Sequence, residues 1–94
     1  MSSLRLQDKV AIVTGSSSGI GREICLYYAR EGAKVVCADL APTPRKAEAT
    51  DESTHSAINE AGGKAIFVQT DVGDPEQVQR LVAAAVTEYG RLDM

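Results

Sequence analysis

Near its amino end the chain reads Val10-Ala11-Ile12-Val13-Thr14-Gly15-Ser16-Ser17-Ser18-Gly19-Ile20-Gly21. The apolar run at 10–14 predicts a buried strand, the glycines predict a turn, and the residues from Gly19 to Arg30 predict a helix. Backbone N–H groups in the first turn of a helix lack partners within the helix, and the helix dipole is positive there. Because glycine has no side chain, a diphosphate can approach these N–H groups closely. The stretch therefore predicts an anion-binding turn.

The glycine spacing distinguishes this turn from two common phosphate loops. A Walker loop requires Gly-Lys where this chain has Ile20-Gly21. The G-x-G-x-x-G pattern does not fit either, because here the wider gap falls between the first two glycines. We expect Gly15 to make the turn, Gly19 to leave room for a pyrophosphate, and Gly21 to allow close packing of the helix on the strand.

Thr14 to Gly21 resembles the T-G-x-x-x-G-I-G signature of the short-chain dehydrogenases/reductases. Three later segments match the family at consistent positions, namely Ala38-Asp39-Leu40, Thr70-Asp71-Val72 and Gly90-Arg91-Leu92-Asp93. The resemblance covers nearly the whole chain. It implies an oxidoreductase that moves hydride between a nicotinamide ring and an alcohol or carbonyl substrate.

Strand and helix patterns alternate along the chain, which is typical of βαβ units around a parallel sheet. The predicted strands span about 10–14, 34–38 and 65–68, and the predicted helices span about 19–30, 52–61 and 75–89. Leu92-Asp93-Met94 would begin a fourth strand. With the resemblance, this order predicts an α/β fold: part of a doubly wound Rossmann-like parallel sheet, with strand order 3-2-1 and flanking helices. We expect residues 1–94 to be the amino-terminal part of one such domain, truncated before its catalytic half.

Local signals define two helix ends and three helix faces. Asp74 is a good N-cap, Pro75 suits the first helical position, and Gln77 completes a start similar to a capping box. Gly32 is expected to end the first helix in a left-handed conformation.

Apolar residues recur at helical spacing in the first helix at Ile20, Ile24, Tyr27 and Tyr28. The second helix is expected to bury Thr54, Ala57, Ile58 and Ala61. In the third helix the apolar face comprises Val78, Leu81, Val82, Ala85, Val86 and Tyr89.

Asp39 indicates the cofactor. It follows the second strand and lies 18 positions after Gly21, close to the spacing of about 20 expected for an acid that binds the adenosine ribose. A carboxylate accepts hydrogen bonds from both ribose hydroxyls but repels a 2′-phosphate, so NAD is expected and NADP is less favoured. Members of the family that prefer NADP often carry a basic residue where this chain has Ser18 or Leu40. A loop predicted at 41–51 contains Arg45 and Lys46, which could fold over the adenosine.

The resemblance implies that adenine meets the Asp71 carboxylate and the backbone of Val72. An alternative is that Asp71 stabilises the turn that leads to the Asp74 cap. The residues expected to bind the cofactor are Gly15, Ser17, Ser18, Gly19, Ile20, Gly21, Asp39, Asp71 and Val72.

No catalytic residue is assigned. The family uses a Tyr with a Lys four residues later, but the positions four beyond Tyr27, Tyr28 and Tyr89 are Glu31, Gly32 and Asp93. The N-N-A-G segment that usually follows the start of the fourth strand is also missing. We therefore expect the 94 residues to be inactive alone. The alternative function is a non-catalytic nucleotide-binding or interaction module derived from the same family; a flavin-binding or methyl-transfer Rossmann protein fits the glycine spacing less well.

Composition excludes several classes of partner. A net charge of −3 without a basic cluster argues against nucleic acid and against an anionic membrane surface. Cys25 and Cys37 lack the spacing of a zinc site and are expected to be reduced and buried, and His55 to be solvated, so no metal is assigned.

No secretory signal or apolar run of 18 residues is present, which favours a cytoplasmic location. The resemblance implies that a full-length form can be a homo-oligomer.

Overall fold

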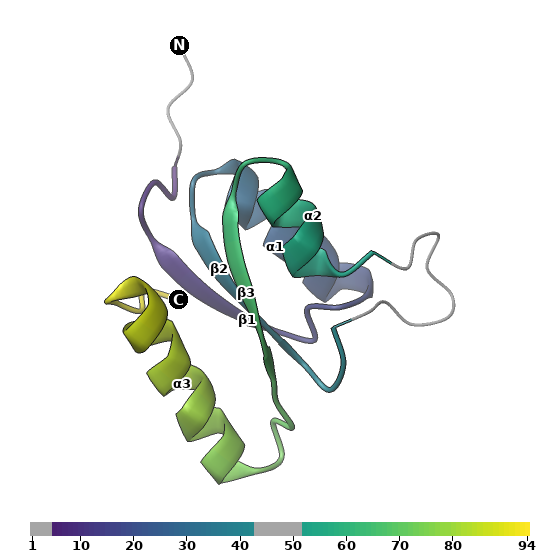
Figure 1. Cartoon of the computed structure of the whole chain (residues 1–94), viewed down its shortest axis with the longest axis vertical. Helices are drawn as coiled ribbons and strands as arrows, with labels where there is room; N and C mark the ends of the chain where they lie inside the picture. The colour runs from purple at the N-terminus through teal and green to yellow at the C-terminus, as the bar shows by residue number, and fades with distance from the viewer. Residues whose placement is uncertain (1–4, 43–51) are drawn as a thin grey trace.

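The computed structural model describes residues 5–42 and 52–94 (Figure 1). Its elements follow one another as β1 (Val10–Thr14), α1 (Gly19–Arg30), β2 (Lys34–Asp39), α2 (Thr54–Glu60), β3 (Lys64–Gln69) and α3 (Pro75–Tyr89). The strands form one parallel sheet in the order β1-β2-β3, so the predicted order 3-2-1 is confirmed. Most of the predicted loop at 41–51 lies outside the described residues.

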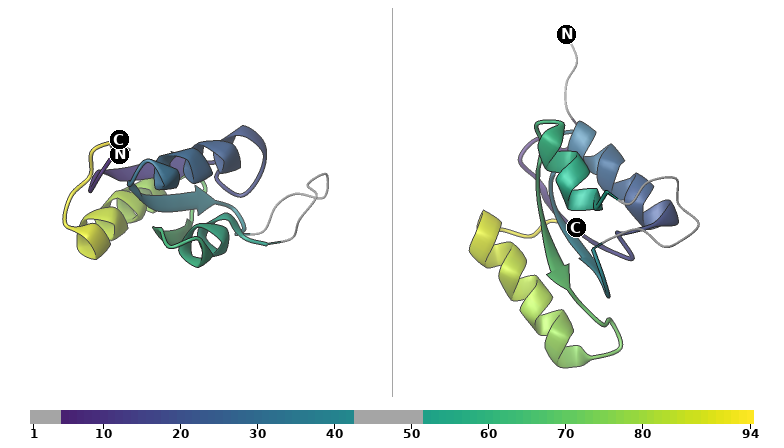
Figure 2. Two further views of the ribbon diagram at one scale, coloured as in Figure 1. Left: turned by 90° about the horizontal axis from the view of Figure 1, so that it is seen from above. Right: turned by 45° about the vertical axis from the view of Figure 1, so that its right-hand side comes forward.

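The helices cover both faces of the sheet (Figure 2). Because successive side chains of a strand point to opposite faces, each strand contributes to two separate apolar clusters. The cluster beneath α1 and α2 contains Val13, Cys25, Ala33, Val35, Cys37, Ile58 and Ala65. The cluster beneath α3 contains Val10, Val36, Ala38, Leu81 and Ala85. The central strand β2 is buried on both faces, as its run of β-branched and small apolar residues requires.

Glycines and caps set the helix ends. Gly32 has φ +95° after α1 and Gly90 has φ +81° after α3, so both adopt the left-handed conformation that ends a helix. The Asp74 carboxylate accepts a hydrogen bond from the Glu76 N–H at 3.0 Å, which confirms it as the N-cap of α3. Gln77 differs from the expected box, because its side-chain amide donates to the Asp74 carboxylate at 3.1 Å.

The second helix is shorter than predicted. It begins at Thr54 because Ser53 is its N-cap, with the Ser53 hydroxyl accepting from the Ser56 N–H at 3.4 Å. It ends at Glu60, which leaves Ala61 as an exposed cap residue, so the expectation that Ala61 is buried was wrong. Thr54 and Ile58 are buried as expected.

The apolar row predicted on α1 lies mostly outside the core. Ile20 is 80% exposed and Tyr27 is 46% exposed, whereas Cys25 is fully buried against β2. On α3, Leu81 and Ala85 face the sheet, and Val82 and Val86 remain exposed. The described sheet has only three strands, so its faces are too narrow to cover every apolar side chain of the two longer helices.

The carboxyl-terminal residues lie along the outer edge of β1. The Ile12 N–H donates to the Met94 carbonyl at 2.8 Å, and the Met94 N–H donates to the Val10 carbonyl at 3.2 Å. This is the pattern of a parallel bridge. The Asp93 carboxylate accepts from the Val10 N–H at 2.9 Å and from the Arg91 guanidinium. The segment therefore has the pairing expected at the start of a fourth strand.

Acid should weaken the attachment of this segment to β1. Hydrogen bonds from Arg91, and next from the Val10 N–H, lower the pKa of Asp93 below its ordinary value of 3.8. Because the folded-state pKa is depressed, the stability that Asp93 contributes is present above about pH 3.8 and is lost as the pH falls through the folded-state pKa. The Val10 amide shift, followed by NMR during acid titration, should change with a midpoint below 3.8. The Asp93→Asn variant should lack this transition, and a midpoint at or above 3.8 in the parent chain would contradict the assignment.

Candidate functional site

The turn between β1 and α1 depends on two glycines in the left-handed conformation. Gly15 has φ +67° and Gly19 has φ +57°, a region that residues with a side chain rarely adopt. A Cβ built on either one would meet no atom within 4 Å. The turn thus needs glycine for its backbone conformation, and the space beside both residues is open.

Gly21 is needed for a different reason. A Cβ at this position would lie 2.0 Å from the Gly15 carbonyl oxygen and 2.6 Å from its carbon. The first turn of α1 therefore packs backbone against backbone on the glycine turn, which is the close packing expected of Gly21. This contact directs the N-terminus of α1 towards the carboxyl edge of the sheet.

The serines of the turn are directed inward. Ser16, Ser17 and Ser18 are 0%, 3% and 7% exposed. The Ser16 N–H donates to the Ala38 carbonyl at 3.2 Å, and the Ser16 hydroxyl donates to the same oxygen at 3.3 Å. The Ser17 hydroxyl donates to the Ala41 carbonyl. Both side chains thus fasten the turn to the end of β2 and to the residues after it.

Asp39 lies at the carboxyl end of β2, beside the turn. One carboxylate oxygen, Oδ2, accepts from the Ser17 N–H at 3.1 Å, and the other, Oδ1, accepts from the Leu40 N–H at 2.8 Å. The side chain is half-buried. The acid that the sequence indicated as the ribose ligand is therefore hydrogen-bonded directly to the glycine turn.

Asp71 and Val72 follow β3 at the same edge. The Asp71 carboxylate accepts from the Gly73 N–H at 2.9 Å, and its carbonyl accepts from the Asp74 N–H at 2.9 Å. These bonds confirm the alternative that Asp71 stabilises the turn into α3, and the adenine contact stays a prediction. Val72 and Leu40 are 63% and 61% exposed. Sequence reasoning did not single out Leu40 as an exposed apolar side chain near the turn, although its position directly after Asp39 could have suggested this.

Thr54, the first residue of α2, was also missed as a site residue. It is 1% exposed, and its hydroxyl donates to the Ser16 carbonyl at 2.7 Å and accepts from Arg22 Nη1 at 3.0 Å. The local sequence pattern does not predict this contact, because the two residues are 38 positions apart. The next residue, His55, was expected to be solvated, but it is half-buried and its ring stacks on Phe67 with 5.8 Å between the centroids.

The two cysteines are free and buried, as predicted. Their sulfur atoms lie 4.0 Å apart, and the hydrogen bond between them raises the pKa of Cys25 and lowers the pKa of Cys37. Within 5–42 and 52–94, no group of three or more His, Cys, Asp or Glu residues could hold a metal ion. Over the same ranges, no helix has the length and apolar character to cross a bilayer.

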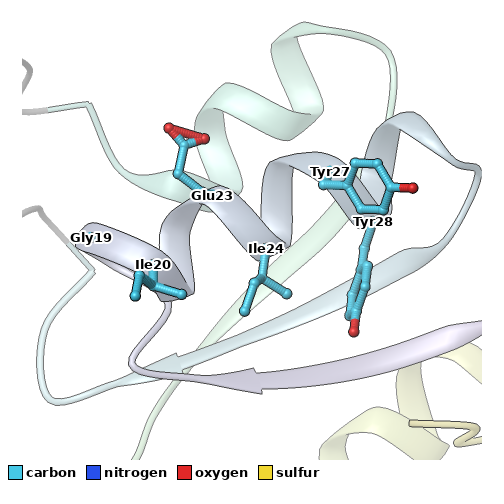
Figure 3. A pocket seen from close by; sticks show the side chains of 6 residues that line it. All are labelled: Gly19, Ile20, Glu23, Ile24, Tyr27 and Tyr28. Carbon is cyan, nitrogen blue, oxygen red and sulfur yellow. The ribbon is translucent and has the colours of Figure 1, made fainter.

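A groove of about 510 Å³ runs along α1 from its amino end. Figure 3 shows Ile20, Ile24 and Tyr28 on one side of the helix and Glu23 on the opposite side. The groove is lined by Gly19, Ile20, Glu23, Ile24, Tyr27 and Tyr28. The groove reaches the glycine turn at Gly19, and neither Asp39 nor Asp71 lines it. The exposed Ile20 lies where the turn meets this largely apolar groove.

Comparison with known proteins identifies the family. Residues 9–94 match the family model described as short chain dehydrogenase. The chain belongs to the short-chain dehydrogenase family. Members of this family bind nicotinamide dinucleotides, and the turn fits such a ligand because Gly15 and Gly19 leave open space beside it.

The relatives are longer proteins. The chain is 48% identical over 90 residues to an uncharacterized oxidoreductase of Methylorubrum extorquens, covering 96% of this chain and 34% of the relative. It is 45% identical over 89 residues to a short chain dehydrogenase/reductase of Aspergillus oryzae, covering 95% of this chain and 32% of the relative. The crystal structure of a hydroxysteroid dehydrogenase from Escherichia coli has a TM-score of 0.82 and 31% identity, covering 96% of this chain and 36% of that one. The chain thus spans about a third of these proteins, and it matches their amino-terminal part.

Replacing Gly21 should be more destabilising than replacing a glycine that has only an unusual conformation. In Gly21→Ala the new methyl group collides with the Gly15 carbonyl, which should cost about 3 kcal/mol of unfolding free energy. Gly62→Ala is the matched control, because Gly62 has φ +92° but open space around it, and it should cost about 1 kcal/mol. Urea unfolding measures both values, and equal losses would show that the Gly21 contact relaxes freely.

Proposed function

We propose that this chain binds the adenosine diphosphate half of NAD in an oxidoreductase that interconverts an alcohol and a carbonyl compound. The observation that carries the proposal is the hydrogen bond between the Ser17 N–H and the Asp39 carboxylate, at 3.1 Å. In a dinucleotide the adenosine ribose is joined directly to the diphosphate. A ribose-binding acid must therefore lie beside the phosphate-binding turn, as Asp39 does.

The chain offers a suitable surface for each part of this ligand. The diphosphate would lie over the turn beside Gly19, where the N-terminus of α1 favours an anion. Each Asp39 oxygen has one N–H donor from the chain, and a carboxylate has about four acceptor positions, so the ribose hydroxyls can still bind. The exposed apolar side chains of Leu40 and Val72 would flank adenine.

The same acid favours NAD over NADP. A 2′-phosphate would place about two negative charges beside the Asp39 carboxylate. Ser18 and Leu40 provide no positive charge there. Arg22, a nearby cation, donates from Nη1 to the Glu52 carbonyl at 2.8 Å and to the Thr54 hydroxyl, so this nitrogen is already hydrogen-bonded within the protein.

When bound, the nicotinamide ring supplies or accepts the hydride. The residues of this chain would bind and orient the ligand. Ile20, which is exposed at the start of α1 and lines the groove in Figure 3, would be one of its contacts. The printed sequence contains no Tyr-x-x-x-Lys, so the proposal gives these 94 residues a binding role. We place the protein in the cytoplasm, where reducing conditions keep a close pair of thiols such as Cys25 and Cys37 unoxidised.

Titration calorimetry with NAD and NADP tests the proposal. The parent chain should bind NAD at least tenfold more tightly than NADP. The Asp39→Asn variant should narrow this ratio, because the amide oxygen still accepts from the Ser17 N–H while the repelling charge is gone. The Asp39→Ala variant should weaken binding of both ligands, because the turn and the ribose each lose an acceptor.

The control is Glu88→Ala, which removes an exposed acid near the far end of α3 and should leave both affinities unchanged. Equal binding of NAD and NADP by the parent chain would contradict the proposed preference. Undetectable binding of both would contradict the site itself.

A further inference from the structure

We propose that Thr54 is a positioning residue for the diphosphate turn, acting through the peptide group between Ser16 and Ser17. The inference rests on the proposed function, because it assigns a residue of α2 to the same dinucleotide site. Thr54 lies outside the glycine pattern and follows a different strand from the one that leads into the turn. Hydrogen bonds at both ends of one peptide group support this role.

The Ser16–Ser17 peptide is fixed from two sides. Its carbonyl oxygen accepts from the Thr54 hydroxyl at 2.7 Å. Its N–H donates to the Asp39 carboxylate at 3.1 Å. A peptide group is planar, so the direction of the carbonyl determines the direction of the N–H. The Thr54 hydroxyl therefore helps to aim the Ser17 N–H at Asp39.

The Thr54 hydroxyl is itself fully oriented. Its oxygen accepts from Arg22 Nη1 at 3.0 Å, and Arg22 also donates to the Glu52 carbonyl at 2.8 Å. Because Thr54 is 1% exposed, water cannot readily replace either partner. Arg22 belongs to the first turn of α1, so the bonds join the start of α1, the start of α2 and the glycine turn.

This arrangement prepares the turn for an anion. Without the Thr54 hydroxyl, the buried Ser16 carbonyl would lose the side-chain donor that holds it in the described part of the chain, and the peptide could rotate away from Asp39. The turn would then have to be reordered whenever a diphosphate binds, which lowers affinity. The ligand class concerned is any nucleotide that carries adenosine diphosphate.

Three variants separate positioning from general stability. Thr54→Val keeps the shape of the side chain and removes its hydroxyl, and Thr54→Ser restores a hydroxyl. Ser53→Ala is the matched control, because it removes the N-cap of the same helix, whose hydroxyl bonds Ser56, while leaving the bond between Thr54 and Ser16. Each full chain is titrated with ADP-ribose by calorimetry, and its unfolding midpoint is measured in parallel.

Thr54→Val should bind ADP-ribose about tenfold more weakly than the parent chain, and Thr54→Ser should recover most of the affinity. Ser53→Ala should lower the unfolding midpoint while changing the affinity less than twofold. In ¹H–¹⁵N NMR spectra, the Ser17 amide proton should move upfield in Thr54→Val, as it should in Asp39→Ala, and should stay in place in Ser53→Ala.

The Asp39→Ala variant distinguishes failure of the inference about Thr54 from failure of the proposed function. If the parent chain binds ADP-ribose and Asp39→Ala weakens binding, but Thr54→Val keeps both its affinity and its Ser17 amide shift, the inference about Thr54 fails alone. It also fails if Ser53→Ala weakens ADP-ribose binding as much as Thr54→Val does. If the parent chain does not bind ADP-ribose, the proposed function and the inference fail together.

Discussion

The contact between Gly21 and the Gly15 carbonyl is the constraint on which the candidate site depends. With a Cβ only 2.0 Å from that oxygen, no side chain can occupy position 21 while the turn keeps its shape. The contact brings the first turn of α1 against the end of β1. It therefore determines both where the helix starts and which way its first N–H groups point. The anion site proposed at this edge would therefore depend on backbone packing before any charged side chain is considered.

Hydrogen bonds from distant parts of the chain then complete the turn. Polar groups buried in a turn need partners inside the protein, because water cannot reach them. The Ser16 N–H is satisfied by Ala38, the Ser17 N–H by Asp39, and the Ser16 carbonyl by Thr54. These partners come from the end of β2 and the start of α2. The turn is therefore a product of the assembled sheet and helices, and its preorganisation depends on them.

This division explains which features the sequence could predict. The spans of α1 and α3 and the roles of Gly21 and Asp74 follow from local patterns, the strand order follows from the family resemblance, and the structure agrees with all of these. Thr54 and His55 depend on which residues approach from elsewhere, and a threonine or histidine in a helical pattern carries no sign of that. The apolar row on α1 could be recognised in the sequence. Periodicity, however, gives only the spacing of these residues and not whether another element packs against them. Cys25 is buried because it packs against β2, while Ile20 is left 80% exposed.

Under the proposed function, Asp39 would link the choice of cofactor to the integrity of the turn. Its carboxylate accepts from the Ser17 N–H, and in the proposed site the same carboxylate would face the ribose or a 2′-phosphate. A lysine or arginine at this position would attract a 2′-phosphate, but both side chains have only donors. The Ser17 N–H would then lose its acceptor, and the Ser16–Ser17 peptide would be fixed by Thr54 alone. A change to NADP is therefore expected to need a positive charge introduced beside position 39, with the acceptor at that position retained as asparagine.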